Sequence, residues 1–179
     1  MTSQRLLLKL RTHLMLLMLG AATAFAAPAG EHSDAPKVGT AQLGKPLVLK
    51  FKATDERDVD LAKLKGKVVL VDFWATWCGP CMRELPNVKA TYDKLHGKGF
   101  EIVGVSFDKE KGALAHVMKK EKMTWPQYFE TKTDEHRIGE KLGIESIPAM
   151  WLIDRKGNLR DLDARAELTA RVEKLLAEK

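Results

Sequence analysis

The chain of 179 residues contains two cysteines, Cys78 and Cys81, which stand three positions apart. They follow an apolar run, residues 69–74, that is typical of a buried strand, and a pattern compatible with a helix comes next. Residues three apart on a helix share a face, with about 5–6 Å between their Cβ atoms. Because a disulfide spans Cα separations of roughly 4.4–6.8 Å, the two sulfurs can join and part without unfolding of the chain. The spacing therefore predicts a dithiol redox site.

The position of the pair at the start of a helix predicts a different role for each sulfur. A helix amino terminus presents unpaired N–H groups and the positive end of the dipole, which lower the pKa of a nearby thiol. Cys78 lies at this end and is the predicted nucleophile, whereas Cys81 lies one turn further and is the predicted resolving thiol. Pro80 fits the first helical turn because its missing N–H costs little there, and Gly79 keeps the approach to Cys78 open.

Other uses of a cysteine pair remain as alternatives. A structural disulfide across two residues constrains so little chain that it stabilises only weakly. A zinc site needs further ligands, and no second Cys-x-x-Cys or His pair supplies them. A thiol peroxidase needs a threonine three residues before its cysteine, where this chain has Ala75. A copper-binding module would combine both thiolates with a nearby histidine, for which the candidates are His96, His116 and His136.

Longer stretches around the cysteines resemble the thioredoxin superfamily. Residues 73–81 have the sequence Phe-Trp-Ala-Thr-Trp-Cys-Gly-Pro-Cys, which resembles that superfamily's active site. Residues 82–86 and 104–108 resemble the extracytoplasmic TlpA/ResA-like branch, and Ile147-Pro148 resembles the cis-proline of the family. The resemblance runs from about residue 38 to the C-terminus. It implies an α/β thioredoxin fold with an N-terminal β-hairpin and a central strand–helix insertion.

Two carboxylates near the cysteines gain roles from this resemblance. Asp72 lies inside the apolar run, where an ionised carboxylate is expensive to bury and its pKa rises. Thioredoxin has an aspartate at the same place, six residues before the first cysteine, which implies that Asp72 accepts the proton of Cys81. Glu84 follows Cys81 by three residues, and the ResA-like branch implies that it tunes the thiols. The simpler interpretations are a hydrated strand end for Asp72 and a solvated helix acid for Glu84.

The resemblance also implies a surface that binds the substrate chain. In this fold the cis-proline loop packs against the cysteine pair, and the residue before the proline pairs with the substrate through its backbone. The residues expected to bind substrate are Trp77, Gly79, Pro80, Ile147 and Pro148. Pro148 also shields the thiols and has no N–H to ligate a metal, and we expect neither a cofactor nor a bound metal.

Hydrophobic periodicity predicts the elements that position these residues. An N-terminal hairpin is expected over 47–53 and 59–61, followed by a short helical turn over 61–64 and the central strand. A long helix is expected from about Cys78 to His96, with apolar positions 85, 88, 92 and 95 on one face and a kink at Pro86. The later expected elements are a strand over 100–107, a helix around 113–118, a short strand before 129, a short helix after 134, a strand over 149–154, a hairpin partner from 159 and a last helix over 168–176.

The first 26 residues have the pattern of a secretory signal peptide. A basic region precedes the apolar residues 14–22, and Ala24-Phe25-Ala26 is a small-x-small site, so cleavage is expected after Ala26. An uncleaved anchor is the alternative, but the apolar stretch is shorter than the ~20 residues that span a membrane. Residues 27–45 are expected to form a flexible lead-in and 46–179 a thioredoxin-like domain. Removing the leader lowers the formal charge from +6 to +3, with 27 basic against 24 acidic residues, which does not favour nucleic-acid binding.

These features together predict a periplasmic thiol–disulfide oxidoreductase. Thioredoxin, which has the same Gly-Pro between its cysteines, has a potential of about −270 mV, whereas the oxidant DsbA lies near −120 mV. The sequence therefore favours a disulfide reductase, with a disulfide oxidase or isomerase as the alternative. The resemblance implies protein disulfide substrates, apocytochromes among them, and a membrane-embedded electron donor. We expect a monomer.

Overall fold

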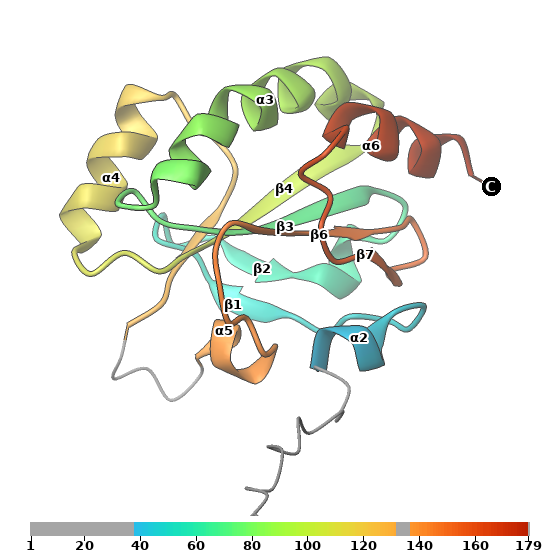
Figure 1. Ribbon diagram of the computed structural model, residues 1–179. Helices are drawn as coiled ribbons and strands as arrows, with labels where there is room; N and C mark the ends of the chain where they lie inside the picture. Colours follow the sequence, from blue (N-terminus) through green and yellow to red (C-terminus); the bar gives the residue numbers. More distant parts are fainter. Residues whose placement is uncertain (1–37, 132–136, 179) are drawn as a thin grey trace, which may run out of the picture. The chain divides into compact units, whose positions relative to one another are not determined.

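The computed structural model describes residues 38–131 and 137–178, and a mixed five-stranded sheet lies at its centre. The strands of this sheet are β3 (Val68–Trp74), β4 (Phe100–Ser106), β5 (Gln127–Phe129), β6 (Ala149–Ile153) and β7 (Leu159–Asp161). They stand in the order β5-β4-β3-β6-β7 (Figure 1). Strands β3, β4 and β5 are parallel, while β6 is antiparallel to β3 and β7 is antiparallel to β6.

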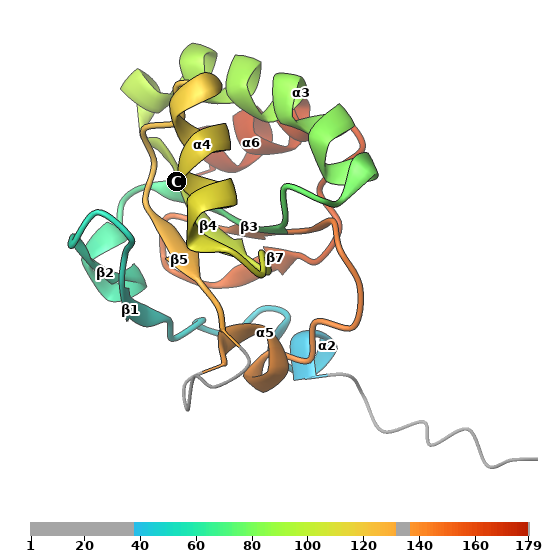
Figure 2. The ribbon, with the colours of Figure 1, turned by 90° about the vertical axis from the view of Figure 1, so that its left-hand side faces the viewer.

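Helices and a hairpin cover the two faces of the sheet. On one face lie α3 (Gly79–Leu95), α4 (Lys111–Lys120) and α6 (Leu168–Ala177) (Figures 1 and 2). On the other face lie α2 (Val38–Gln42), α5 (Ile138–Lys141) and a hairpin formed by β1 (Lys50–Lys52) and β2 (Asp58–Asp60). Two 3-10 helices, η1 (Leu61–Leu64) and η2 (His96–Lys98), precede β3 and follow α3.

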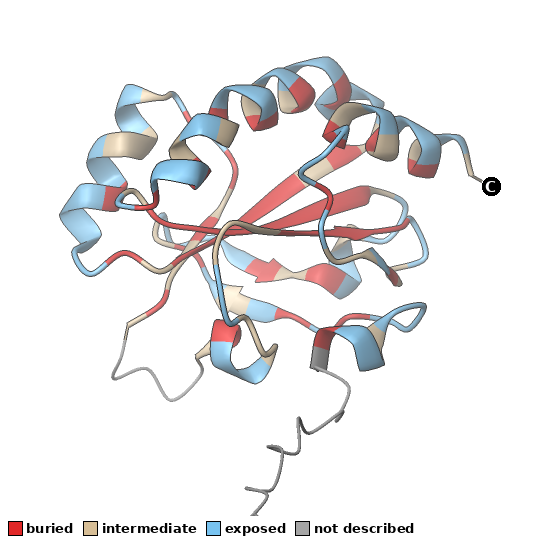
Figure 3. Cartoon of the chain, in the orientation of Figure 1, coloured by how far each residue is buried: buried red, intermediate tan, exposed pale blue. Residues whose placement is uncertain are grey.

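Strand β3 is the centre of the core. All seven of its residues are buried, and they alternate between two clusters because successive side chains of a strand point to opposite faces. Positions 68, 70 and 74 pack with the face of α3 and α6, while positions 69, 71 and 73 pack with the hairpin and α5. Figure 3 shows this burial along the strands, with the outer faces of the helices exposed. The rigid end of β3 therefore fixes where the next residues begin.

The residues after β3 lead directly into α3. The helix begins at Gly79, and its buried side includes Leu85, Val88 and Leu95, which confirms the predicted apolar face, while Tyr92 is partly buried. The helix continues through Pro86. From α3 the chain returns as β4, parallel to β3, so the expected strand–helix–strand unit is confirmed.

The predicted α/β thioredoxin fold is confirmed, and its hairpin differs from the prediction in length. The three paired residues of β1 replace the strand expected over 47–53. Leu47 and Leu49 are buried in the same core cluster as the hairpin but precede β1 and are not paired with β2. The alternation of apolar and polar residues over 47–53 therefore reflects burial and not strand pairing.

Helix α2 was not predicted and lies in the second half of the segment expected to be a flexible lead-in. Its Gly39 approaches Trp151 so closely that a Cβ atom there would lie 2.8 Å from the indole carbon Cζ2. The backbone N–H of Gly44 then donates to the carbonyl of Leu159 at 2.8 Å. These contacts tie residues 38–45 to β6 and β7.

The predicted signal peptide and its cleavage site lie outside the described residues. Within residues 38–131 and 137–178, no helix combines the length and the apolar character that crossing a membrane requires.

Candidate active site

The two cysteines form a disulfide at the first turn of α3. Their Cα atoms are 5.2 Å apart, within the range that the three-residue spacing predicts. Cys78 is the N-cap residue in an extended conformation, and its Sγ accepts a hydrogen bond from the backbone N of Cys81 at 3.2 Å. Both cysteines are buried, whereas Gly79 and Pro80 between them are exposed. The helix therefore presents an N–H donor to the sulfur predicted to be the nucleophile.

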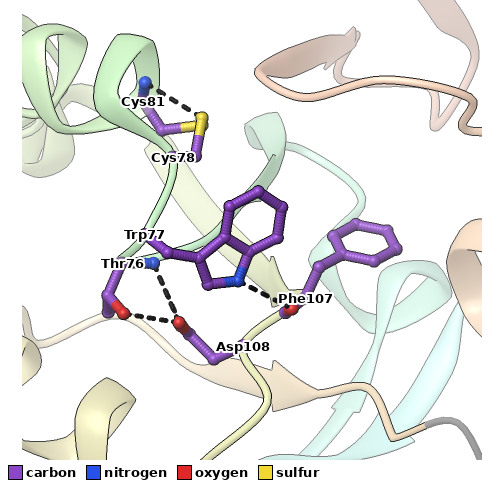
Figure 4. The surroundings of a disulfide bond; sticks show 6 residues. All are labelled: Thr76, Trp77, Cys78, Cys81, Phe107 and Asp108. Carbon is purple, nitrogen blue, oxygen red and sulfur yellow. Dashed lines mark hydrogen bonds between the residues drawn. A yellow bond between two sulfur atoms is a disulfide. The ribbon is translucent and has the colours of Figure 1, made fainter.

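A carboxylate from the loop after the neighbouring strand, β4, holds the turn before Cys78 (Figure 4). Asp108 accepts hydrogen bonds from the backbone N of Thr76 at 3.0 Å and from its hydroxyl at 2.5 Å. The hydroxyl of Ser106 donates to the same carboxylate at 2.8 Å. Asp108 is only 3% exposed, so three donors hold a buried carboxylate two residues after the end of β4.

Trp77 is the most exposed element of this turn. Its side chain is 60% exposed, and its indole N–H donates to the carbonyl of Phe107 at 3.3 Å (Figure 4). A large apolar ring held in solvent beside a reactive disulfide is a typical contact surface for a partner protein.

The predicted cis-proline loop lies beside the cysteine pair. The peptide bond between Ile147 and Pro148 is cis, as the resemblance implied. Pro148 lines a small cavity together with Cys81, Asp72 and Glu84. The structure thus brings together two predicted carboxylates, the predicted resolving cysteine and the proline.

The buried carboxyl of Asp72 is the most perturbed acid of this cavity. It lies mid-strand in β3 and is 6% exposed. Burial, with a further contribution from the negative charge of Glu84, raises the pKa of Asp72 to about 7. A carboxyl with this pKa can take up and release a proton near neutral pH, which is the property that a general base requires.

Two surface grooves flank the disulfide and the cis-proline loop. The first, here called the indole groove, has a volume of about 620 Å³ and is lined by Trp77, Phe107, Ile144 and Ile147 among others. The second, here called the arginine groove, has a volume of about 420 Å³ and is lined by Pro80, Arg83, Glu84, Pro148, Asp163 and Arg165. Of the residues predicted to bind substrate, Trp77 and Ile147 lie in the first groove, Pro80 and Pro148 in the second.

Of the histidines proposed for a copper-binding module, His96 lies far from the cysteines. His96 follows the last residue of α3, and a helix of this length places it about 25 Å from the first turn. His116 lies on α4, and His136 lies outside the described residues. Within the described ranges, no group of three or more His, Cys, Asp or Glu side chains could hold a metal ion.

Sequence reasoning gave no role to Asp108, Ser106 or Arg83. Asp108 lies two residues after the end of the apolar strand β4, and a polar residue after a parallel strand is a signal that could have identified it. Arg83 stands between Cys81 and Glu84, and nothing in the sequence distinguishes it from an ordinary solvated helix residue.

Comparison with known proteins agrees with dithiol chemistry at this site. A family model described as Redoxin matches residues 27–176. A thiol-disulfide oxidoreductase ResA of Bacillus cereus is 31% identical over 161 residues, which are 89% of this chain and 87% of that protein. ResA of Bacillus subtilis (strain 168) is 30% identical over 106 residues, which are 59% of this chain and 58% of that protein.

Two solved structures give the same result for the fold. The thioredoxin domain of a thiol-disulfide oxidoreductase from Bacteroides vulgatus has a TM-score of 0.65 and 31% identity, over 73% of this chain and 94% of its own. A thiol:disulfide interchange protein from Bacteroides sp. has a TM-score of 0.64 and 30% identity, over 76% of this chain and 93% of its own. With a closed disulfide at the start of α3, these relationships show that the chain belongs to the Redoxin family and is a TlpA/ResA-like thiol–disulfide oxidoreductase of the thioredoxin superfamily.

Proposed function

We propose that this oxidoreductase reduces disulfides of protein substrates in the periplasm through the Cys78–Cys81 dithiol. The observation that carries the proposal is the arrangement at the start of α3. One sulfur accepts an N–H bond at the helix terminus, and the other shares a cavity with a buried carboxyl, Asp72. This arrangement supplies a group for each of the two steps of disulfide exchange.

In the first step, the thiolate of Cys78 attacks one sulfur of the substrate disulfide. A mixed disulfide forms between Cys78 and the substrate, and the other substrate sulfur leaves as a thiolate that takes a proton from water. The amides and the dipole at the start of α3 favour the thiolate of Cys78 over its thiol.

In the second step, the thiol of Cys81 loses its proton to Asp72 and attacks the sulfur of Cys78. The internal disulfide closes and the second substrate sulfur leaves, so two electrons have passed from the dithiol to the substrate. The raised pKa of Asp72 supports its role as proton acceptor, and Glu84 contributes to that raised pKa. Since Asp72 and Cys81 line the same cavity, a water molecule can carry the proton where they do not touch.

The reductive direction rests on the Gly79-Pro80 dipeptide between the cysteines, which thioredoxin shares. The potential of thioredoxin is about −270 mV, which is about 150 mV below that of DsbA. Disulfides persist in the periplasm, so a reductase there needs a supply of electrons, for which we propose a membrane-embedded donor. Apocytochromes are the proposed substrates, and the protein is proposed to act as a monomer.

Trapping and redox titration test this proposal together. The variant Cys81→Ser cannot resolve its mixed disulfide, so we expect it to accumulate covalent substrate complexes in cells, whereas Cys78→Ser accumulates none. Equilibration of the wild type with glutathione buffers should give a potential nearer to about −270 mV than to about −120 mV. A potential near that of DsbA contradicts the reductive direction and favours an oxidase. Fusion of residues 1–40 to a reporter that is active only outside the cytoplasm tests the location.

The proton acceptor is tested by Asp72→Asn. This variant should keep the fold and form the mixed disulfide normally, but release it more slowly because Cys81 has lost its base. Single-turnover kinetics above and below neutral pH measure the release step. Unchanged release rates on both sides of neutral pH would contradict the role of Asp72 as the proton acceptor of Cys81.

A further inference from the structure

Arg83 is an exposed cation beside the disulfide, and it has no carboxylate partner among the residues that the structure describes. It lies on the first turns of α3, and its Nη1 is 3.5 Å from the point where a Cβ atom on Gly79 would lie. Throughout residues 38–131 and 137–178, no Asp or Glu oxygen comes within ion-pair distance of its guanidinium. Arg83 therefore stands over the Cys-Gly-Pro-Cys turn with its donors open to solvent.

The other charged side chains of the arginine groove make hydrogen bonds within the protein. Arg165 makes a two-point contact with Asp163, at 2.6 Å from Nε to Oδ1 and 2.8 Å from Nη2 to Oδ2. Glu84 accepts a hydrogen bond from the side-chain amide of Asn87 at 2.5 Å. Arg83 is thus the cation of this groove without an ion pair within residues 38–131 and 137–178, and a partner that complements it carries a negative charge.

The arginine groove lies beside the cis-proline loop and the Cys-Gly-Pro-Cys turn. Pro80 and Pro148 form walls of the arginine groove, while Ile147 and Trp77 line the indole groove. Consecutive residues of the cis-proline loop therefore face different grooves. We expect a substrate segment whose cysteine reaches Cys78 to pass over this loop, with one flank toward each groove.

We propose that Arg83 selects substrates by binding an acidic side chain that flanks the reacting cysteine, while the other flank packs an apolar side chain against Trp77. This inference rests on the proposed function and names the class of segment that the same site prefers. The planar guanidinium can hold a carboxylate through two parallel N–H···O bonds, which a lysine or an amide cannot do. The positive end of the α3 dipole lies beside it and favours the same charge.

Matched disulfide peptides test the preference. The peptides have one sequence and differ at a single position beside the attacked cysteine, which is Glu, Gln or Lys, with one set for each side of the cysteine. We expect the wild type to reduce the Glu peptide of one set with a kcat/KM about three- to ten-fold above that of the Lys peptide, as exposed charge pairs give. The ratio should fall as salt rises above about 0.15 M, where the screening length is about 8 Å.

Variants locate the source of the preference. The Glu/Lys ratio should approach one in Arg83→Gln and invert in Arg83→Glu. Arg155→Gln is the matched control, because Arg155 is also exposed and without an ion pair in the described ranges but lies in the turn after β6. Strand β6 runs antiparallel to β3, so this turn lies at the other end of the strands from the disulfide, and the control should keep the wild-type ratio. A ratio taken within one variant cancels any change in the pKa of Cys78.

The outcomes separate this inference from the proposed function. Equal kcat/KM for all peptides of both sets in the wild type, or an unchanged ratio in Arg83→Gln, overturns the inference and leaves the reductase intact. A wild type that reduces neither the peptides nor insulin contradicts the proposed function, and this inference with it.

Discussion

The carboxylate of Asp108 holds Thr76 at two points, 3.0 Å from its backbone N and 2.5 Å from its hydroxyl. Asp108 follows β4 and Thr76 follows β3, so the contact joins the ends of two adjacent parallel strands. Thr76 is two residues before Cys78. The position of the nucleophile at the start of α3 therefore depends on a carboxylate from the loop after the neighbouring strand.

Loss of this carboxylate should loosen the turn and weaken the fold. Asp108→Ala leaves the N–H of Thr76 and the hydroxyl of Ser106 without their acceptor, and we expect the free energy of unfolding to fall by about 3 kcal/mol. Urea unfolding of the oxidised protein measures this change. The adjacent exposed Lys109→Ala should change stability by no more than about 0.5 kcal/mol. Equal stability of the two variants would show that the contact does not hold the turn.

Asp72 should make the stability of the oxidised protein depend on pH. Its pKa is about 7 in the folded protein and about 3.9 when unfolded, so the folded state binds the proton more tightly. Its contribution is therefore most favourable below about pH 4, decreases as pH rises, and is fully lost above about pH 7. Asp72→Asn cannot ionise, and its stability relative to the wild type should rise over this window by about 4 kcal/mol at most. Urea unfolding across the window measures the difference, and a difference that stays constant with pH contradicts it.

The chemistry of the site could be predicted from sequence because the residues that perform it lie close together along the chain. Cys78 and Cys81 are three residues apart, and the apolar run that positions them forms the central strand. Asp72 could be found because a carboxylate inside such a run is conspicuous. The role of Asp108 depends on strands that pair only in the fold, so no short sequence pattern shows its contact with Thr76.

The fold was predictable where hydrophobic periodicity is strong and less so where it is weak. The long helix α3 begins within one residue of its predicted start, since its apolar face repeats over several turns. The five residues of α2 are too few for a periodic signal, and the helix is held by contacts such as that of Gly39 with Trp151. Leu47 and Leu49 suggested a longer strand because a buried loop and a strand can share the same alternation.

Trp77 should contribute to substrate binding and hardly to stability. Its ring is 60% exposed, so Trp77→Ala should change the free energy of unfolding by no more than about 0.5 kcal/mol. Loss of an aromatic contact at the centre of a protein interface costs about 2 kcal/mol or more, so kcat/KM for insulin should fall at least about 30-fold. Turnover of a small aromatic-free disulfide should be little affected, and Trp77→Phe, which keeps a ring, should retain part of the insulin activity. An equal loss of kcat/KM for insulin and for the small disulfide would show that Trp77 acts on the reactivity of the thiols and not on substrate binding.

Gly104 allows the buried side chain of Gln127 to reach Trp74. A Cβ atom on Gly104 would lie 2.0 Å from Gln127 Oε1, which accepts the indole N–H of Trp74 at 3.0 Å. Gly104→Ala should therefore destabilise the protein by about 2–3 kcal/mol, because Gln127 is fully buried and cannot move aside. Gly112→Ala is the matched control, since nothing lies within 4 Å of its Cβ position in α4 and alanine favours a helix by up to about 1 kcal/mol. Thermal unfolding compares the two variants, and a neutral Gly104→Ala would contradict this packing.

The pH dependence of alkylation in the reduced protein tests the central claim most directly. Cys78 is the N-cap residue of α3, and its thiol should ionise with a pKa at least about one unit below the value of about 8.5 for free cysteine. Iodoacetamide should therefore modify Cys78 first, with a rate that is half-maximal at a pH below about 8.5. Modification of Cys81 first, or a Cys78 titration at or above about 8.5, would contradict the assignment of Cys78 as the nucleophile.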